Sequence, residues 1–362
     1  MHLGEEPLRS MGAMYSKKKV VIVDDSRSIR HWLRLVLERD PRLEVVGEAD
    51  CAASARDVIK QTNPDVITLD IEMPGMNGLA FLERLMALRP MPVVMISAAT
   101  QSNSEATITA LSLGAVDCIL KPANAADSAT CRDITRRVFS AACSTVQVGR
   151  RARPAAPAAI GRRTGPMPII LIGASTGGVG ALESVLADLP VDAPPVVIVQ
   201  HMPGAFLVSF SQMLNRQLPQ DVAIAREGEA LEDGQVRLAP AIGKDTQVSR
   251  RGGVWQCHFV QPAQDSLYCP SVDSLFLSAR EAATDVIAVI LTGLGRDGAA
   301  GLLDLRSAGA ATLGQDAASS VVYGMPRAAW EAGAVAEQLP LSQIGGGIMR
   351  AVEKHAAGRG RG

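Results

Sequence analysis

The chain has 362 residues, of which 47% are apolar and 20% charged, and its formal net charge is −1. A near-neutral chain with 3% aromatic residues offers neither a general basic surface for nucleic-acid phosphates nor many rings on which bases could stack. The length suits two domains, because compact domains mostly run ~100–200 residues. No apolar run approaches the ~20 residues of a membrane span or has the place and length of a signal peptide, so we expect a cytoplasmic protein without membrane insertion.

Two structured stretches are expected, separated by a linker. Residues 1–16 show no apolar period and predict a disordered leader, and residues 351–362 predict a disordered tail. Residues 143–166 are rich in Arg, Pro and Ala and predict a solvated tether between a domain at 17–142 and a domain at 167–350. The six cysteines form no Cys-x-x-Cys pair, so reduced thiols are expected.

The first stretch alternates short apolar runs with helical segments. The expected strands are KVVIV, LEVVG, DVITL, PVVMI and VDCIL, and the expected helices span 26–39, 51–61, 78–88, 104–113 and 128–142. Five successive βα units predict an α/β domain with a doubly wound parallel sheet.

Charged residues follow several of these strands. Asp24 and Asp25 end the first strand, Asp70 ends the third, and Lys121 follows the fifth. One acidic strand end alone is ordinarily a solvated helix cap. The carboxyl ends of parallel strands share one edge of the sheet, however, so these four side chains should converge. Three crowded carboxylates suit Mg²⁺, which prefers oxygen ligands, and a neighbouring lysine suits an incoming phosphoryl group.

The segments VVIVDDSRSIR, ITLDIEMPGMNG, VVMIS and LKP resemble the signatures of response-regulator receiver domains, which have a flavodoxin-like fold. This resemblance implies a histidine kinase as phosphodonor. The site residues that it implies are the phosphoacceptor Asp70, the Mg²⁺ site of Asp24, Asp25, Asp70 and the backbone carbonyl of Glu72, the phosphate partner Lys121 and the switch hydroxyl Ser97. Cys118 stands where many receivers carry an aromatic switch residue.

The second stretch is also an α/β series and predicts a second doubly wound parallel sheet. Its expected strands are PIILIG, PPVVIVQ and VIAVILTG, with an expected hairpin through VAIAREG and QVRLAP. Ser175 lies in GASTGG, between a strand and a helical pattern, and matches G-x-S-x-G. Such a turn can expose a nucleophilic hydroxyl beside backbone N–H groups. A phosphate-binding loop is the rival interpretation, although GASTGGVG fits neither common glycine-rich phosphate motif. A plain strand-to-helix turn is equally compatible with the motif alone.

A nucleophilic serine needs a base, and two histidines of this stretch are candidates. His201 directly follows the strand PPVVIVQ, on the sheet edge expected for Ser175, and is favoured. His258 lies in the hairpin strand of GGVWQCHFV and remains the alternative. Asp297 follows VIAVILTG and could orient the imidazole, although an Asp there is by itself more often a turn residue. The chain order Ser, His, Asp differs from that of α/β-hydrolases.

The segments GASTGG, QHMPGAF, CPSVDSLF, ILTGLGRDGAAGL and GQDAASSVVYGMP resemble the catalytic domain of chemotaxis protein-glutamate methylesterases, the CheB family. The resemblance implies Ser175 as nucleophile, His201 as base and Asp297 as orienting carboxylate. It also implies Thr176 as the neighbour of the nucleophile and the N–H near Leu294 as an oxyanion donor. Departures from the family pattern occur at Ala317 and in segment 239–245.

The resulting expectation is a phosphorylation-regulated methylesterase that demethylates chemoreceptors for sensory adaptation by an acyl-enzyme mechanism, with glutamine deamidation as a second activity. We expect a monomer with Mg²⁺ in the receiver and no cofactor in the esterase domain, and no nucleic acid as partner. One alternative is a catalytically idle adaptor that binds receptors under receiver control. A hydrolase for small soluble esters is the other.

Overall fold

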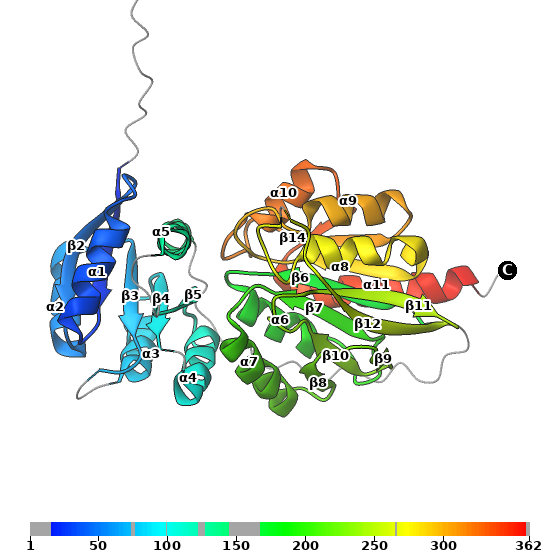
Figure 1. The fold of residues 1–362 in the computed structure, drawn as a ribbon, viewed down its shortest axis with the longest axis horizontal. Coiled ribbons are helices and arrows are strands. Elements are labelled where there is room, and N and C mark those ends of the chain that lie inside the picture. Colours follow the sequence, from blue (N-terminus) through cyan, green and yellow to red (C-terminus); the bar gives the residue numbers. More distant parts are fainter. Residues whose placement is uncertain are drawn as a thin grey trace, which may run out of the picture.

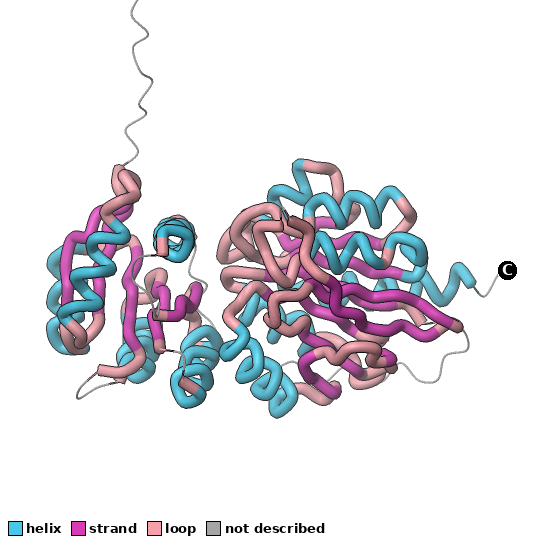
Figure 2. Tube along the Cα trace, in the orientation of Figure 1, coloured by secondary structure: helices cyan, strands magenta, loops and turns pink. Residues whose placement is uncertain are grey.

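The computed structural model has two lobes, one blue to cyan and one green to red in Figure 1. It describes residues 16–73, 77–98, 100–121, 127–144, 167–264 and 266–359. Apart from Ser16, the predicted leader 1–16 lies outside these residues, and so do all but the first two residues of the predicted linker 143–166. Each lobe combines strands with surrounding helices (Figure 2), which confirms the predicted α/β class.

The first lobe is a five-stranded parallel sheet with the order β2-β1-β3-β4-β5. Its strands are β1 (Lys18–Val23), β2 (Leu43–Ala49), β3 (Val66–Asp70), β4 (Val93–Ser97) and β5 (Asp117–Leu120). Its helices are α1 (Arg27–Leu37), α2 (Ala52–Thr62), α3 (Gly78–Leu88), α4 (Gln101–Ser112) and α5 (Ser128–Ala142). Every predicted strand and helix is present. Helix α4 begins three residues before the predicted start, because the Thr100 side chain caps it by accepting a hydrogen bond from the Asn103 N–H.

The second lobe is built on a seven-stranded sheet whose order is β15-β14-β13-β6-β7-β10-β8 and whose paired strands are all parallel. Its strands are β6 (Ile169–Ala174), β7 (Val196–Gln200), β8 (Asp221–Ile224), β10 (Gln235–Leu238), β13 (Val286–Ile290), β14 (Ala311–Gln315) and β15 (Glu337–Leu339). Its helices are α6 (Gly178–Ala187), α7 (Gly204–Gln217), α8 (Val272–Ser278), α9 (Ala299–Ser307), α10 (Met325–Glu331) and α11 (Leu341–Arg359), with a short 3₁₀ segment at Arg280–Asp285.

The central strands of this sheet are buried on both faces. Ile170 and Ile172 of β6 belong to the core beneath α6, α7 and α11, whereas Ile169 and Leu171 face a second core beneath α8, α9 and α10. A strand covered on both sides reads as a continuous apolar run, which is the pattern of IILIG. The predicted doubly wound sheet is therefore confirmed.

One predicted connection is wrong. VAIAREG and QVRLAP do not form a hairpin, because β8 and β10 pair in parallel. The chain between them leaves the sheet to form β9 (Ala230–Leu231), which pairs antiparallel with β12 (Val254–Val260). Strand β12 also pairs with β11 (Asp245–Arg251), in the hairpin expected around His258. The turn residues between VAIAREG and QVRLAP are compatible with a hairpin and with a parallel arrangement. Only the pairing of the strands in the folded sheet distinguishes the two.

The predicted disordered tail is also wrong over most of its length. Helix α11 continues to Arg359, well past residue 351. His355 on this helix places Nε2 2.7 Å from Oδ1 of the buried Asp285, which also pairs with Arg250. This contact joins the end of the helix to the body of the second lobe. The composition of AAGRGRG gives no sign of this contact, because Asp285 lies 70 residues away from His355 in the chain.

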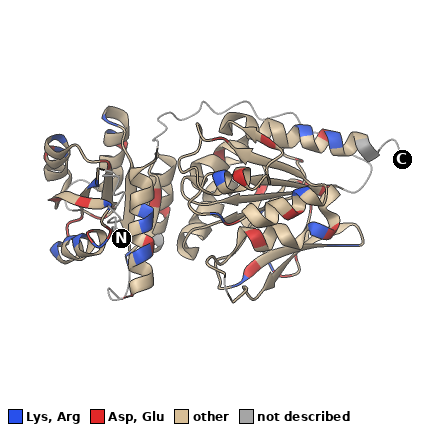
Figure 3. Cartoon of the chain, turned by 90° about the horizontal axis from the view of Figure 1, so that it is seen from above, with Lys and Arg blue, Asp and Glu red and all other residues tan. Residues whose placement is uncertain are grey.

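Charged residues of both signs are interspersed over the two lobes when the molecule is seen from above (Figure 3). Among the residues that the structure describes, no helix is both long enough and apolar enough to cross a membrane.

We predict that His355→Ala loosens the last turns of α11, because the buried Asp285 carboxylate loses a hydrogen bond. Backbone amides after residue 351 should exchange hydrogen about tenfold faster than in the wild type, as measured by hydrogen exchange with mass spectrometry. Lys354→Ala, at an exposed position of the same helix, is the matched control and should exchange like the wild type. Equal exchange in both variants would contradict an anchoring role for His355.

Candidate active site

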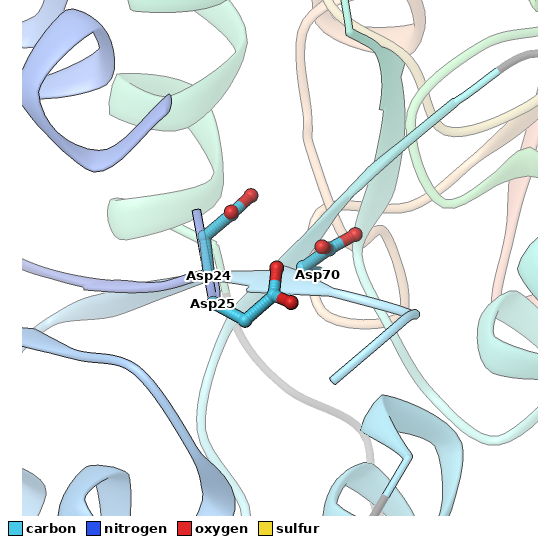
Figure 4. A group of neighbouring side chains, drawn as sticks. All are labelled: Asp24, Asp25 and Asp70. Atoms are coloured by element: carbon cyan, nitrogen blue, oxygen red, sulfur yellow. The ribbon is translucent and has the colours of Figure 1, made fainter. Parts of the chain in front are cut away.

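Three carboxylates meet at the carboxyl edge of the first sheet. Asp24 and Asp25 follow β1 and Asp70 ends β3, and Figure 4 shows their side chains gathered at this edge. One potential ligand atom from each residue lies within 4.8 Å of the others. Asp24 and Asp70 are buried, whereas Asp25 is exposed. The convergence predicted from strand order is therefore present.

Lys121 supplies the positive charge of this cluster. Its Nζ lies 2.7 Å from Oδ2 of Asp70 and 2.9 Å from Oδ2 of Asp24. Burial raises the pKa of Asp70, and the nearby charge of Asp24 adds to the rise, although Lys121 opposes it. Burial lowers the pKa of Lys121, but its hydrogen bonds to the two carboxylates outweigh burial and the net pKa is raised. One ammonium against three carboxylates leaves a negative excess, and this donor set of hard oxygens fits a divalent cation.

Three further residues are predicted for this part of the first lobe, namely Ser97, Glu72 and Cys118. Ser97 ends β4, between the strands that lead to Asp70 and Lys121, and its hydroxyl donates to the Ala98 carbonyl at 3.2 Å. The side chain of Glu72 is exposed in the segment after β3. Cys118 is fully buried in β5. Among the described residues, the structure thus brings Ser97 to the cluster's edge and gives its hydroxyl a local partner, the Ala98 carbonyl.

Three polar residues follow adjacent strands of the second sheet. Ser175 follows β6, His201 follows β7 and Asp297 follows β13, and these strands are neighbours in the order β13-β6-β7. The Ser175 turn is fixed by its backbone, because its N–H donates to the Thr292 carbonyl at 3.0 Å and its carbonyl accepts from the Gln200 side chain at 2.8 Å. The predicted convergence on one sheet edge is present here as well.

The Asp297 carboxylate is held by several donors. Its Oδ2 lies 2.9 Å from Nε2 of His201 and accepts the Val272 N–H at 2.8 Å. Its Oδ1 accepts the Ser271 hydroxyl at 2.9 Å and the Asp273 N–H at 3.0 Å. Burial by itself would raise the pKa of Asp297, but the pairing with His201 and these backbone donors hold it below its ordinary value. The carboxylate therefore remains ionised and fixes the orientation of the imidazole.

The other nitrogen of the imidazole, Nδ1, is not engaged by Asp297. Because Nε2 pairs with Asp297, Nδ1 is free to accept a proton, and it is buried without a hydrogen-bond partner among the described residues. His201 and Ser175 both line a hollow of about 340 Å³, together with Thr176 and Leu294. The arrangement suits a hydroxyl nucleophile with an adjacent base.

His258 is in a different environment. Its Nε2 lies 2.7 Å from the Ser249 hydroxyl and its Nδ1 3.7 Å from Glu227, on the small antiparallel sheet. Ser249 belongs to a regular β-strand, whereas Ser175 precedes the first turn of a helix. A helix start presents backbone N–H groups that can stabilise an oxyanion, and a strand interior does not. The geometry thus favours His201 over His258.

The structure adds residues that the sequence did not single out. Ser271 and Gln200 support Asp297 and Ser175, and the Thr292 hydroxyl donates to the Thr176 carbonyl at 3.0 Å. Tyr268 stacks on the His201 ring, with centroids 4.5 Å apart and an interplanar angle of 5°. Gln200 had a sequence signal, since it is a polar residue at the end of a buried strand. The other contacts join segments far apart in the chain, so no local pattern announces them.

The first lobe lies against the edge that carries Ser175. The Thr176 hydroxyl donates to Oδ2 of Asp117 in β5 at 2.8 Å, and the next N–H, of Gly177, donates to the Val116 carbonyl at 3.1 Å. Asp117 also pairs with Arg137 of α5, so its charge is compensated within the first lobe. The residue after Ser175 is therefore buried against the other lobe.

Helix α4 extends this contact. It packs against α6 and α7, beside which it lies in Figure 1, and its Ser112 hydroxyl donates to Glu183 of α6 at 2.7 Å. A hollow of about 870 Å³ is lined by residues of both lobes, with Ser175 and His201 among them. Access to these two side chains thus depends on how the lobes are placed.

Comparisons with known proteins cover both lobes. Residues 20–130 match the model of the response regulator receiver domain, and residues 170–348 match that of the CheB methylesterase. The chain is 49% identical over 337 residues to protein-glutamate methylesterase/protein-glutamine glutaminase 1 of Caulobacter vibrioides, covering 92% of this chain and 98% of that protein. The protein-glutamate methylesterase/protein-glutamine glutaminase of Rhizobium etli is 46% identical over 339 residues, covering 93% of this chain and 97% of that protein.

The second lobe also resembles a solved structure. The crystal structure of the Thermotoga maritima CheB methylesterase catalytic domain aligns with a TM-score of 0.50 and 31% identity, over 51% of this chain and 99% of that one.

A serine-directed fluorophosphonate should label this protein at Ser175, because the hydroxyl lies beside a buried base. Ser175→Ala should abolish labelling, and His201→Ala should slow it by at least about 100-fold, the usual contribution of a general base. Mass spectrometry of the labelled peptide and the labelling rate give both results.

His258→Ala is the matched control for the base and should label at the wild-type rate. Fast labelling of His201→Ala together with slow labelling of His258→Ala would show that His258 is the base instead.

Proposed function

The chain belongs to the family of protein-glutamate methylesterases/protein-glutamine glutaminases, and we propose that it hydrolyses glutamyl methyl esters of chemoreceptors and deamidates receptor glutamines. The observation that carries this proposal is the His201–Asp297 pair beside Ser175. We assign 17–142 as the receiver domain and 167–350 as the catalytic domain.

In the first half-reaction, the Ser175 hydroxyl attacks the γ-carbonyl carbon of the ester and its proton passes to Nδ1 of His201. The tetrahedral intermediate then expels methanol, which takes that proton, and leaves an acyl-enzyme. Asp297 stabilises the imidazolium that forms in between, and its lowered pKa keeps it charged for this purpose. For a glutamine substrate, the leaving group is ammonia.

In the second half-reaction, water attacks the acyl-enzyme with His201 as base, and a glutamate carboxylate and free Ser175 result. Backbone N–H groups at Thr176 and near Leu294 are our candidates for oxyanion donors, because both residues line the hollow beside the nucleophile. An amide donor does not depend on side-chain identity, so Leu294 is suited to this role.

Control begins at the acidic cluster. We assign Asp70 as the phosphoacceptor, with the carboxylates of Asp24, Asp25 and Asp70 and the backbone carbonyl of Glu72 as the residues that would hold Mg²⁺. When bound, Mg²⁺ would neutralise the charge of the carboxylates and of the phosphoryl group during transfer. Lys121 already contacts Asp70 and would hold the phosphoryl oxygens, and Ser97 would donate its hydroxyl.

The unphosphorylated receiver limits access to the nucleophile. Its β5 and α4 contact Thr176, Gly177 and Glu183, next to or near Ser175. A phosphoryl group at Asp70 adds negative charge at the end of β3, which β4 separates from β5, and favours an arrangement with a weaker contact. Phosphorylation thus exposes Ser175 to the receptor.

The phosphodonor is a histidine kinase of the same signalling pathway. We propose the cytoplasm as the location, because the described cysteines form no disulfide with one another, as expected in a reducing compartment. A monomer suffices for the chemistry, because Ser175, His201 and Asp297 come from one chain and no cofactor is needed for acyl transfer. The idle-adaptor alternative is not favoured, since the relatives carry enzyme names.

Methanol release from methylated receptor membranes is the direct test of the activity. Release should rise when Mg²⁺ and a small phosphodonor are added, and Asp70→Asn should abolish the rise without abolishing basal release. Ser175→Ala should release none. If the protein is phosphorylated at Asp70 but releases no methanol from cognate receptors, the esterase proposal is contradicted.

Restricted access is tested at the α4–α6 contact. Ser112→Glu should raise methanol release without phosphodonor, about threefold or more, because two carboxylates would face each other where a hydrogen bond now joins the lobes. The double variant Ser112→Glu/Glu183→Lys restores opposite charges and should return release towards the wild-type level. Unchanged release in Ser112→Glu, with normal phosphorylation, would contradict control by this interface.

A further inference from the structure

Tyr268 covers one face of the His201 imidazole. The two rings are parallel, with centroids 4.5 Å apart, and Tyr268 reaches this position from the loop before α8. Gly295 makes room for it, because a Cβ at Gly295 would lie 2.6 Å from the Tyr268 hydroxyl oxygen. Gly295 also has a φ of 93°, which other residues rarely adopt. Two separate loops of the second lobe therefore fix the stack.

The hydroxyl of the same tyrosine is held by the other lobe. Arg136 of α5 donates from one terminal nitrogen to the Tyr268 hydroxyl at 2.9 Å. Its other terminal nitrogen donates to Asp133 on the same helix at 2.7 Å, which orients the guanidinium. The two lobes are thus joined through a residue that touches the imidazole.

We propose that Tyr268 is a positioning residue for the His201 base, acting through its ring, and that its hydroxyl couples this base to the receiver through Arg136. The inference rests on the proposed assignment of His201 as the base and adds a further positioning residue and a point of regulation to that site.

The ring is needed because a single hydrogen bond does not fix an imidazole. His201 is bound to Asp297 through Nε2, and rotation about that axis would change the direction of Nδ1 within the hollow that His201 shares with Ser175. A parallel ring on one face blocks this rotation. The face of an aromatic ring is also negative, so Tyr268 stabilises the imidazolium that forms when His201 takes the serine proton. Both effects require the ring and neither requires the hydroxyl.

The hydroxyl has a separate consequence. Arg136 moves with α5, so separation of the lobes breaks the Arg136–Tyr268 hydrogen bond but leaves the stack on His201. The bond therefore contributes to docking of the unphosphorylated receiver at the base itself. It is a further contact beside those made by β5 and α4.

The role of the ring is tested on the full-length protein after activation with a phosphodonor. Tyr268→Leu and Tyr268→Gln remove the aromatic ring, and Tyr268→Phe restores the ring without the hydroxyl. Fluorophosphonate labelling of Ser175 measures the chemistry without receptor binding, and methanol release gives kcat and KM. Both ring-free variants should lose about tenfold in labelling rate and in kcat with KM unchanged, and Tyr268→Phe should recover most of the loss. Labelling needs no receptor, so it tests the role of the ring even if no variant releases methanol. A failure of this inference can therefore be distinguished from a failure of the proposed function.

The hydroxyl is tested without phosphodonor. Tyr268→Phe and Arg136→Ala should each label about threefold faster than the wild type, and the double variant should be no faster than either single one, because both remove the same bond. A ring-free variant that labels at the wild-type rate and changes only KM would show that Tyr268 contacts the substrate instead. Slow labelling of Tyr268→Phe would overturn the role of the ring, and additive effects would overturn the coupling.

Discussion

Both sites of this protein depend on one geometric constraint, which is that neighbouring parallel strands end on the same edge of a sheet. In the first lobe this constraint gathers Asp24, Asp25 and Asp70, and in the second it gathers Ser175, His201 and Asp297. The strands that lead to these residues are largely buried and apolar, and the charged and hydrogen-bonding groups of both sites stand where these strands end. The sheets thus supply rigid supports for groups that repel or need fixed orientation.

The two lobes treat a buried carboxylate in opposite ways. Asp70 is buried beside another carboxylate with one ammonium for support, and its pKa is raised. Asp297 is buried as well, but His201, Ser271 and two backbone N–H groups surround it, and its pKa is lowered. The difference matches the two tasks. In the function that we propose, Asp297 must stay charged to orient an imidazole, whereas a cation and a phosphoryl group would complete the acidic cluster.

The contact between the lobes lies at the residues to which we assign the chemistry. Thr176 directly follows Ser175 and donates to Asp117, and Tyr268 stacks on His201 and accepts from Arg136. Each of these contacts joins the nucleophile or the base to the first lobe by one short step. A change in the receiver therefore needs no long pathway to reach the active site, because its β5 and α5 already touch it.

The sequence by itself determined the two parallel sheets and which polar residues stand at their edges, because apolar periodicity is local and an edge residue is the one that follows a strand. It could not decide that β8 and β10 are parallel, or that α11 runs to Arg359 with His355 on Asp285. Nor could it find Ser271 or Tyr268 beside the site. Those features arise where segments distant in sequence pack together, and the free energy of such contacts depends on partners that no local pattern contains.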